Sequence, residues 1–345
     1  MTELADKLRL TCDLTDAELK ALIETDDRET AELLRSHADE VRRLHYGRKV
    51  FLRGLIEISS YCRNDCLYCG IRRSNSSAER YRLTREQIMM CAENGYQLGF
   101  RTFVMQGGED SFFTDDRICE VISELREKYP DCAITLSLGE RSRESCKRMK
   151  EAGADRYLLR HEAASEELYA KLHPSELSLS HRKQCLYDLR SLGYQVGAGF
   201  MVGAPYQTTS DIIADLRFLQ ELKPQMIGIG PFIPHRCTPF ADKEGGSLGL
   251  TLRLLGILRL MFPKVLLPAT TALSTIAENG RELGLQTGCN VIMPNLSPAD
   301  VRKKYDLYDN KASTGSEAAE GCAMLKKCIE AAGYEVAAER GDYIG

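Results

Sequence analysis

The feature of this sequence that most constrains its fold is a regular alternation of short apolar runs with amphipathic stretches, which starts at Val50. The amphipathic stretches, such as residues 84–98, show helical periodicity, and the apolar runs have the length of strands. The eight predicted strands are residues 51–58, 102–105, 133–136, 156–159, 195–201, 226–229, 265–267 and 290–293. Strands that alternate with helices favour a parallel sheet, and eight such units match an α/β fold of the (β/α)8 TIM barrel type. A doubly wound open sheet is the alternative, because periodicity does not separate these two folds.

Helices are also expected before and after the barrel in the sequence. Thr15 and Glu18 form a capping-box pattern in front of a helical apolar stripe, which predicts an N-terminal helical extension. No Pro-, Gly- or Ser-rich linker divides the sequence, so we expect one large unit. Its expected parts are an N-terminal helical cap over residues 1–45, the barrel over 46–310, and a C-terminal segment with helices that packs on the barrel over 311–345. Residues 309–319, which are mostly small and polar, are predicted to be the least ordered stretch.

Charge and hydropathy restrict the partners of the chain. A net charge of −4 and a pI near 6.0 provide no general attraction to phosphate, so nucleic acid is not expected as a partner. The most apolar region, residues 248–262, is interrupted by Arg253 and Arg259, which indicates an amphipathic helix rather than a membrane span. The N-terminus lacks the apolar centre of a signal peptide. We therefore expect a cytoplasmic protein without membrane contact that acts on a small molecule or another protein.

Three of the thirteen cysteines lie close together in the sequence, directly after the first predicted strand. Cys62, Cys66 and Cys69 form a C-x3-C-x2-C loop, whose thiolates can hold a [4Fe–4S] cluster and leave one iron open to an exogenous ligand. A structural zinc site would need a fourth ligand, and no second C-x2-C occurs. A thiol redox pair of Cys66 and Cys69 would leave Cys62 without a role. The other ten cysteines are expected to be ordinary buried residues.

A second motif, Gly107-Gly108-Glu109, follows the second predicted strand. Glycines let a backbone approach a ligand closely, and a carboxylate can accept hydrogen bonds from an ammonium group. Together with the cysteine loop and the aromatic Tyr68 before its last cysteine, this motif resembles the signature of radical S-adenosylmethionine (SAM) enzymes. The resemblance implies that the amino and carboxylate groups of SAM chelate the open iron, and that reductive cleavage of SAM yields methionine and a 5′-deoxyadenosyl radical.

Further stretches resemble one family of this superfamily, the biotin-synthase-like HydE maturases of [FeFe]-hydrogenase. The matching stretches are residues 61–73, 80–84, 135–140, 153–162, 228–235, 268–272 and 290–295. The resemblance implies a complete barrel that encloses a long internal cavity. The SAM contacts that it implies are Tyr68, Gly107, Gly108, Glu109, Glu162, Arg182 and Met201. Within this set, Glu162 would accept from the ribose hydroxyls and Arg182 would bind the methionyl carboxylate.

The family resemblance also implies a substrate site. Its polar floor would consist of Thr135, Ser137, Arg160, Thr270 and Thr271, with Tyr305 and Tyr308 closing the cavity. Threonines and serines in strands more often serve packing, and tyrosines at this spacing often only fill space. The implied substrate is an organometallic iron–cysteine compound that carries CO and cyanide, on the route to the two-iron subcluster. The implied partners are the other hydrogenase maturases and a low-potential electron donor.

One departure from the family pattern concerns the C-terminus. Some HydE proteins carry three further cysteines there for an auxiliary cluster, whereas residues 311–327 contain only Cys322, so we expect a single cluster. Four histidines show no metal-binding spacing and are expected to be structural: His161, His173, His181 and His235. The alternative functions are another biotin-synthase-like enzyme, such as a methylornithine synthase, and a non-catalytic Fe–S scaffold or carrier.

Overall fold

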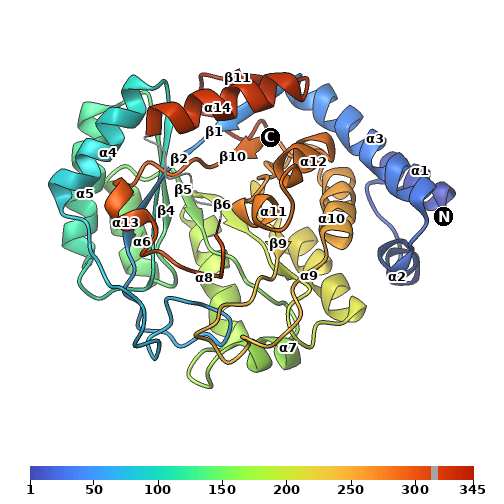
Figure 1. Cartoon of the computed structure of the whole chain (residues 1–345), viewed down its shortest axis with the longest axis horizontal. Coiled ribbons are helices and arrows are strands. Elements are labelled where there is room, and N and C mark those ends of the chain that lie inside the picture. The colour runs from blue at the N-terminus through green and yellow to red at the C-terminus, as the bar shows by residue number, and fades with distance from the viewer. Residues whose placement is uncertain (312–317) are drawn as a thin grey trace.

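The computed structural model describes residues 1–311 and 318–345, and its centre is a parallel barrel surrounded by helices (Figure 1). Its main sheet contains, in spatial order, β2 (Gly54–Ser59), β3 (Thr102–Gly107), β4 (Ala133–Ser137), β5 (Arg156–Leu158), β6 (Gln195–Ala198) and β8 (Met226–Ile227). Each neighbouring pair in this sheet is parallel. The alternating order of strands and helices thus produces the parallel sheet that the sequence predicts.

Single bridges close the ring between β8 and β2. Leu266 pairs with Met226 of β8, Pro268 pairs with β10 (Val291–Ile292), and Asn295 pairs with Leu55 of β2. The predicted (β/α)8 barrel is therefore confirmed, and the open doubly wound sheet is wrong. The predicted seventh strand, residues 265–267, makes only such bridges and is not a regular strand.

Two predicted strands are each broken in the structure. Residues 51–58 divide at Arg53 into β1 (Lys49–Leu52) and β2, because β1 leaves the ring to pair with β10 on one side and β11 (Glu335–Ala337) on the other. Residues 195–201 divide between β6 and β7 (Met201–Val202), where Phe200 pairs with Glu162. β7 then pairs with β9 (Gly230–Pro231). Hydrophobic periodicity marks apolar runs but does not detect a change of pairing partner within a run.

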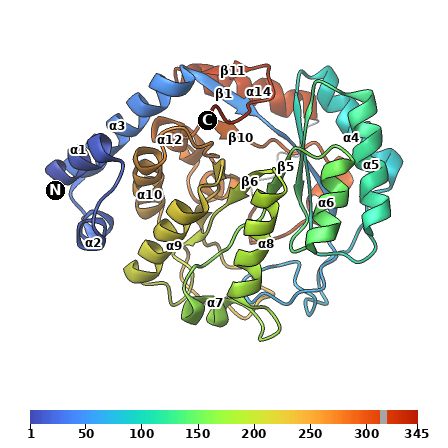
Figure 2. The ribbon, with the colours of Figure 1, turned by 180° about the vertical axis from the view of Figure 1, so that it is seen from behind.

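The outer helices follow the strands around the barrel, as Figures 1 and 2 show from opposite sides. They are α4 (Arg85–Gln97), α5 (Asp115–Lys128), α6 (Arg143–Glu151), α7 (Glu166–Leu172), α8 (Leu179–Ser191), α9 (Thr209–Leu222), α10 (Leu248–Met261), α11 (Thr271–Ile276) and α12 (Gly280–Gln286). The predicted capping box of Thr84 and Gln87 begins α4. Among the described residues, no helix combines the length and the apolar character that a bilayer crossing requires.

Three N-terminal helices lie outside the barrel beside α10 (Figure 1). They are α1 (Thr2–Thr11), α2 (Asp16–Glu24) and α3 (Arg28–Tyr46). The predicted capping box of Thr15 and Glu18 begins α2. Arg253 of α10 donates to the carbonyl of Ile23 at 2.5 Å, and Arg217 of α9 donates to the carbonyl of Leu14 at 2.6 Å. These contacts tie the N-terminal helices to the outer helices of the barrel.

The C-terminal residues cover the amino-terminal end of the barrel. After α13 (Ala299–Arg302), α14 (Ala318–Ala331) and β11, the chain brings Arg340 and Asp342 to the first residues of several strands. Arg156 of β5 donates to the Asp342 carboxylate at 2.6 Å, and Thr102 of β3 donates to the Arg340 carbonyl at 2.8 Å. Most of the stretch predicted to be least ordered, 309–319, lies outside the described residues.

We expect Asp342→Asn to destabilise the barrel, because it removes the carboxylate that pairs with the buried Arg156. The expected loss is about 1–3 kcal/mol in the free energy of unfolding at pH 7, measured by urea titration. The matched control is Glu339→Gln, which breaks a half-exposed ion pair with Lys49 and should change the free energy by less than about 0.5 kcal/mol. A loss for Asp342→Asn no larger than that for Glu339→Gln would show that the Asp342–Arg156 pair does not stabilise the barrel.

The same substitution should show a defined pH dependence. Although burial acts to raise it, hydrogen bonds from Arg156 and Arg340 hold the pKa of the Asp342 carboxyl well below its usual range. A lowered pKa means that the carboxylate contributes its full stability above the unfolded value of about 3.9 and loses it as the pH falls. The stability difference between wild type and Asp342→Asn should therefore be full at pH 7 and shrink below about pH 4.

Candidate active site

A cavity of about 410 Å³ lies at the carboxyl end of the barrel strands, opposite the C-terminal tail. This is the end at which barrel enzymes place their chemistry. Sixteen of the seventeen predicted site residues line it: Cys62, Cys66, Tyr68, Cys69, Gly107, Gly108, Glu109, Ser137, Arg160, Glu162, Arg182, Met201, Thr270, Thr271, Tyr305 and Tyr308. Apolar side chains such as Leu158 and Phe232 complete the wall. The structure therefore gathers residues that are separated by more than half of the chain.

The cysteine loop between β2 and α4 is held in shape by side chains around it. The guanidinium group of Arg80 donates to the carbonyls of Ser60, Ile71 and Arg72 at 2.5, 2.8 and 2.7 Å. Asn75 donates to the carbonyl of Gly70 at 2.6 Å. Because these bonds fix both ends of the loop, its three thiols are presented to the cavity from an ordered backbone.

The electrostatics of the three thiols fit a cationic ligand. None of them is in a disulfide. Burial raises the pKa of each thiol, that of Cys66 to about 12, and the neighbouring sulfurs add to the increase for Cys66 and Cys69. Buried thiols with raised pKa values become thiolates only when a cation replaces their protons. Three such sulfurs from one loop are the donor set that a [4Fe–4S] cluster with one open iron requires.

Gly108 fits the close packing of this loop against β3. A Cβ atom at this position would lie 2.3 Å from the carbonyl oxygen of Tyr61 and 2.7 Å from the Cβ of Cys62. Its amide donates to the carbonyl of Ser59 at 3.2 Å. Only glycine allows the strand end and the cysteine loop to approach this closely, which keeps the cavity open beside Cys62.

A chain of charged residues connects Glu109 to Arg182. The Glu109 carboxylate accepts from Arg63 at 3.0 Å and from the backbone amide of Glu140 at 2.8 Å. Glu140, only 6% exposed, accepts from Arg182 Nε at 2.5 Å. Arg182 also donates to the carbonyl of Arg160 at 2.9 Å. This chain fixes the guanidinium of Arg182, which is 8% exposed, at the cavity wall.

We expect Gly139→Ala to disturb this chain of charges. A Cβ atom at Gly139 would lie 2.1 Å from Glu109 Cγ, and its φ of +72° is also unfavourable for alanine. Gly193→Ala is a matched control, because Gly193 has a φ of +78° and no atom within 4 Å of the added carbon. The free energy of unfolding, measured in urea, should fall by about 1–3 kcal/mol more for Gly139→Ala than for Gly193→Ala. Equal losses in the free energy of unfolding would mean that the Glu109 side chain moves away from the added carbon at no cost in stability.

Glu162 lies in a strained backbone conformation at the cavity. Its φ is +66°, which costs a non-glycine residue about 1–3 kcal/mol. The preceding residue anchors it: His161 and Asp215 are fully buried, with His161 Nε2 3.1 Å from Asp215 Oδ1, and Ala164 donates its amide to the same oxygen at 2.6 Å. Burial lowers the pKa of His161 to about 3, so the imidazole is neutral. His161 is thus structural, as expected, and holds the segment that presents Glu162.

Tyr68 is oriented by the second histidine. The hydroxyl of Tyr68 lies 3.1 Å from His173 Nε2, and His173 Nδ1 lies 2.9 Å from the carbonyl of Tyr169. The carbonyl requires a donor at Nδ1, so Nε2 accepts from the tyrosine hydroxyl. The rings of Tyr169 and His173 stack with centroids 3.9 Å apart. His173 therefore fixes the side chain that precedes Cys69.

Several buried polar atoms at the cavity lack hydrogen bonds within the described structure. They are Arg160 Nε and Nη2, Glu162 Oε2 and Thr270 Oγ1. Arg160 Nη2 lies 3.1 Å from Glu162 Oε2, but the two groups are not oriented for a hydrogen bond. Buried polar groups are normally satisfied, so these atoms indicate a polar ligand in the cavity. SAM, with its ribose hydroxyls, amino group and carboxylate, can supply such partners.

Thr135 does not line the cavity, unlike the other predicted floor residues. It is fully buried on β4, two residues before Ser137, and so lies one layer deeper in the barrel. Its hydroxyl also has no hydrogen-bond partner in the described part of the chain. Strand alternation thus gives the correct face of β4 but not the depth of Thr135, and its contact with the substrate stays a prediction.

One ion pair in the cavity wall was not predicted from the sequence. Glu57 of β2 is fully buried and accepts from Lys311 at 2.6 Å and from Asn295 at 2.7 Å. Burial raises the pKa of Glu57, while Lys311 and Asn295 oppose the increase. Lys311 also donates to the carbonyl of Tyr305 at 2.9 Å. A glutamate inside an apolar strand was the signal that could have revealed this pair.

Comparisons with known proteins agree with this geometry. The profile of the radical SAM superfamily matches residues 56–219. The [FeFe] hydrogenase maturase subunit HydE of Thermotoga maritima is 45% identical over 315 residues, which cover 91% of this chain and 90% of that protein. The 3-methylornithine synthase of Methanosarcina barkeri is 32% identical over 89% of this chain and 86% of that protein.

Solved structures share the fold. A crystal structure of methylornithine synthase superposes with a TM-score of 0.84 at 29% identity, over 97% of both chains. The crystal structure of the maturase HydG has a TM-score of 0.83 at 19% identity, over 97% of this chain and 75% of that one, which supports the fold alone. With the cysteine loop, the barrel and the extent of identity taken together, the chain belongs to the radical SAM superfamily and, within it, to the HydE family.

Proposed function

We propose that this enzyme acts in the assembly of the two-iron subcluster of [FeFe]-hydrogenase. The observation that supports this most strongly is the 45% identity to a HydE maturase over nearly the whole length of both chains. As a radical SAM enzyme it uses a [4Fe–4S] cluster and SAM. When bound, these cofactors supply a 5′-deoxyadenosyl radical, which attacks otherwise unreactive substrate positions.

The proposed work of the protein is to hold and orient the reactants. Cys62, Cys66 and Cys69 would bind the cluster and leave one iron for SAM. Arg182 would pair with the methionyl carboxylate, and Glu162, whose Oε2 lacks a hydrogen bond among the described residues, would accept from the ribose. The apolar wall would exclude water from the reactive centre.

The remaining SAM contacts are proposed from the same end of the barrel. Glu109 would accept from the SAM amino group beside Gly107 and Gly108, while Tyr68 and Met201 would contact the rest of the molecule. Glu109 already accepts two hydrogen bonds from protein donors, and each carboxylate oxygen can accept a further one. The existing bonds would therefore orient the carboxylate rather than compete with the ligand.

The proposed substrate is a small organometallic iron–cysteine compound with CO and cyanide ligands. Arg160, Ser137, Thr270 and Thr271 offer cationic and hydroxyl donors at the cavity wall, which suits anionic or cyanide-bearing ligands. The buried Tyr305 would close this compartment. The proposed partners are the other hydrogenase maturases and a low-potential electron donor.

The test is hydrogenase maturation in a defined mixture. Purified, anaerobically reconstituted enzyme is combined with the other maturases, SAM, a low-potential reductant and apo-hydrogenase, and hydrogen evolution is measured. We expect hydrogenase activity that depends on adding this chain and on SAM. Normal SAM cleavage without maturation would overturn the HydE role and keep the radical SAM activity. Formation of 3-methylornithine would identify the alternative enzyme, and absence of SAM cleavage would indicate a scaffold.

A further inference from the structure

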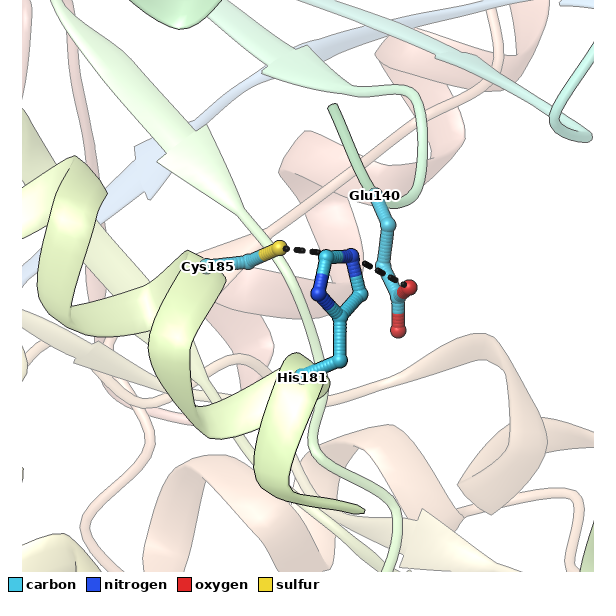
Figure 3. Close-up of side chains that lie close together, drawn as sticks. All are labelled: Glu140, His181 and Cys185. Carbon is cyan, nitrogen blue, oxygen red and sulfur yellow. Dashed lines mark hydrogen bonds and ion pairs between the residues drawn. The ribbon is translucent and has the colours of Figure 1, made fainter. Parts of the chain in front are cut away.

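Three potential metal ligands, Glu140, His181 and Cys185, lie close together outside the lining of the cavity (Figure 3). His181 and Cys185 lie one turn apart on α8, and Glu140 approaches them from the turn after β4. His181 Nε2 faces both partners, 3.7 Å from Cys185 Sγ and 3.4 Å from Glu140 Oε2. The three ligand atoms all lie within 4.8 Å of one another.

The two measured distances match the edges of a tetrahedral metal site. With zinc bonds of about 2.3 Å to sulfur and about 2.05 Å to nitrogen and oxygen, tetrahedral angles place sulfur and nitrogen about 3.5 Å apart and nitrogen and oxygen about 3.3 Å apart. The observed separations are close to both values. The third pair, the sulfur and a carboxylate oxygen, lies within 4.8 Å, so side-chain adjustments alone would bring all three groups onto one cation.

The surroundings of the three side chains also suit a cation. Cys185 and Glu140 are buried, whereas the side chain of His181 is 62% exposed, which provides an entry path and room for a water ligand. Arg182 binds the other carboxylate oxygen, Glu140 Oε1, and therefore leaves Oε2 facing His181. Thiolate and imidazole ligands favour zinc-class divalent ions over Mg²⁺ and Ca²⁺.

We propose that Glu140, His181 and Cys185 bind one zinc-class divalent cation, with water as the fourth ligand. On binding, the S–H bond of Cys185 breaks and its proton leaves to solvent, while a metal–sulfur bond forms and nothing is oxidised or reduced. His181 binds as the neutral imidazole through Nε2. Since Glu140 also holds Arg182, the bound ion connects α8 to the turn after β4 and stabilises the position of that guanidinium.

The test uses the reconstituted holoenzyme, incubated with Zn²⁺ under anaerobic conditions and passed through a desalting column. Zinc K-edge X-ray absorption reports the zinc ligands without interference from cluster iron. We expect one zinc per chain with a single sulfur ligand at about 2.3 Å and the remaining ligands nitrogen or oxygen at about 2.0–2.1 Å. Iron content should stay unchanged.

Variants distinguish zinc binding at this site from zinc binding by other cysteines. Cys185→Ser should remove the zinc–sulfur signal. His181→Gln should weaken zinc binding by more than about 100-fold, because loss of a ligand costs more than the 10- to 100-fold that loss of an outer-shell partner costs. Cys146→Ser, which changes another buried cysteine on α6, should bind zinc like the wild type. Zinc with no sulfur ligand, zinc with three sulfurs at the cost of iron, or a sulfur signal that survives Cys185→Ser would overturn the proposal.

Discussion

Cys66→Ser should abolish the catalytic cluster and lower SAM cleavage by more than about 100-fold. All three thiolates of this loop are needed to hold a [4Fe–4S] cluster with one open iron, and a serine hydroxyl is a much weaker ligand for cluster iron than a thiolate. Reconstituted Cys66→Ser should therefore lose most of its bound iron and the visible absorption of the cluster. The loop itself should persist, because Arg80 and Asn75 hold it through backbone carbonyls.

Cys119→Ser is the matched control for this loss. Cys119 lies half-buried on α5, outside the cavity, and should not affect iron content. If Cys66→Ser kept the iron content and the cluster absorption of wild type, the triad would not be the cluster site. A loss of iron in both variants would point to general damage by serine substitution and would also contradict the account.

Arg182→Met should have two separate effects, one on stability and one on SAM binding. Removal of the guanidinium leaves the Glu140 carboxylate buried without its cation, which should cost about 3–5 kcal/mol in the free energy of unfolding. The same change removes a charge-assisted contact to the SAM carboxylate, which should weaken SAM binding about 10- to 100-fold. Urea unfolding and equilibrium binding to the reconstituted enzyme measure the two effects.

The double variant Arg182→Met/Glu140→Gln separates these effects. Neutralising Glu140 removes the unpaired charge, so stability should return to within about 1 kcal/mol of wild type. SAM binding should stay weak, because the ligand contact is still missing. Recovery of SAM affinity in the double variant would show that Arg182 acts only through the structure and does not contact SAM.

The barrel could be predicted from the sequence because its signal is local and repeated. Each strand and each helix carries its own periodicity, and capping residues such as Thr84 mark the helix starts. The break of the predicted strand 51–58 at Arg53 could not be predicted from the sequence. It arises because β1 leaves the main sheet and pairs with the C-terminal strand β11. That pairing joins opposite ends of the chain, for example Lys49 to Glu335.

The candidate site shows the same limit. The cysteine loop and Gly107-Gly108-Glu109 are contiguous motifs and could be recognised directly. The Glu57–Lys311 pair and the Glu140–Arg182 pair join residues far apart in the sequence, and sequence spacing does not identify the partners, although a glutamate inside an apolar strand marks Glu57 as unusual. His181 and Cys185 have a helical i, i+4 spacing, but metal-binding patterns of paired histidines do not include it.

The central claim is that this chain is a radical SAM enzyme that cleaves SAM at a cluster held by Cys62, Cys66 and Cys69. The most direct test is the formation of 5′-deoxyadenosine by anaerobically reconstituted, chemically reduced enzyme. We predict 5′-deoxyadenosine and methionine in equal amounts from the wild type and from Cys119→Ser, with almost none from Cys66→Ser. Failure of a wild-type sample with a full complement of iron and bound SAM to form 5′-deoxyadenosine would contradict the account.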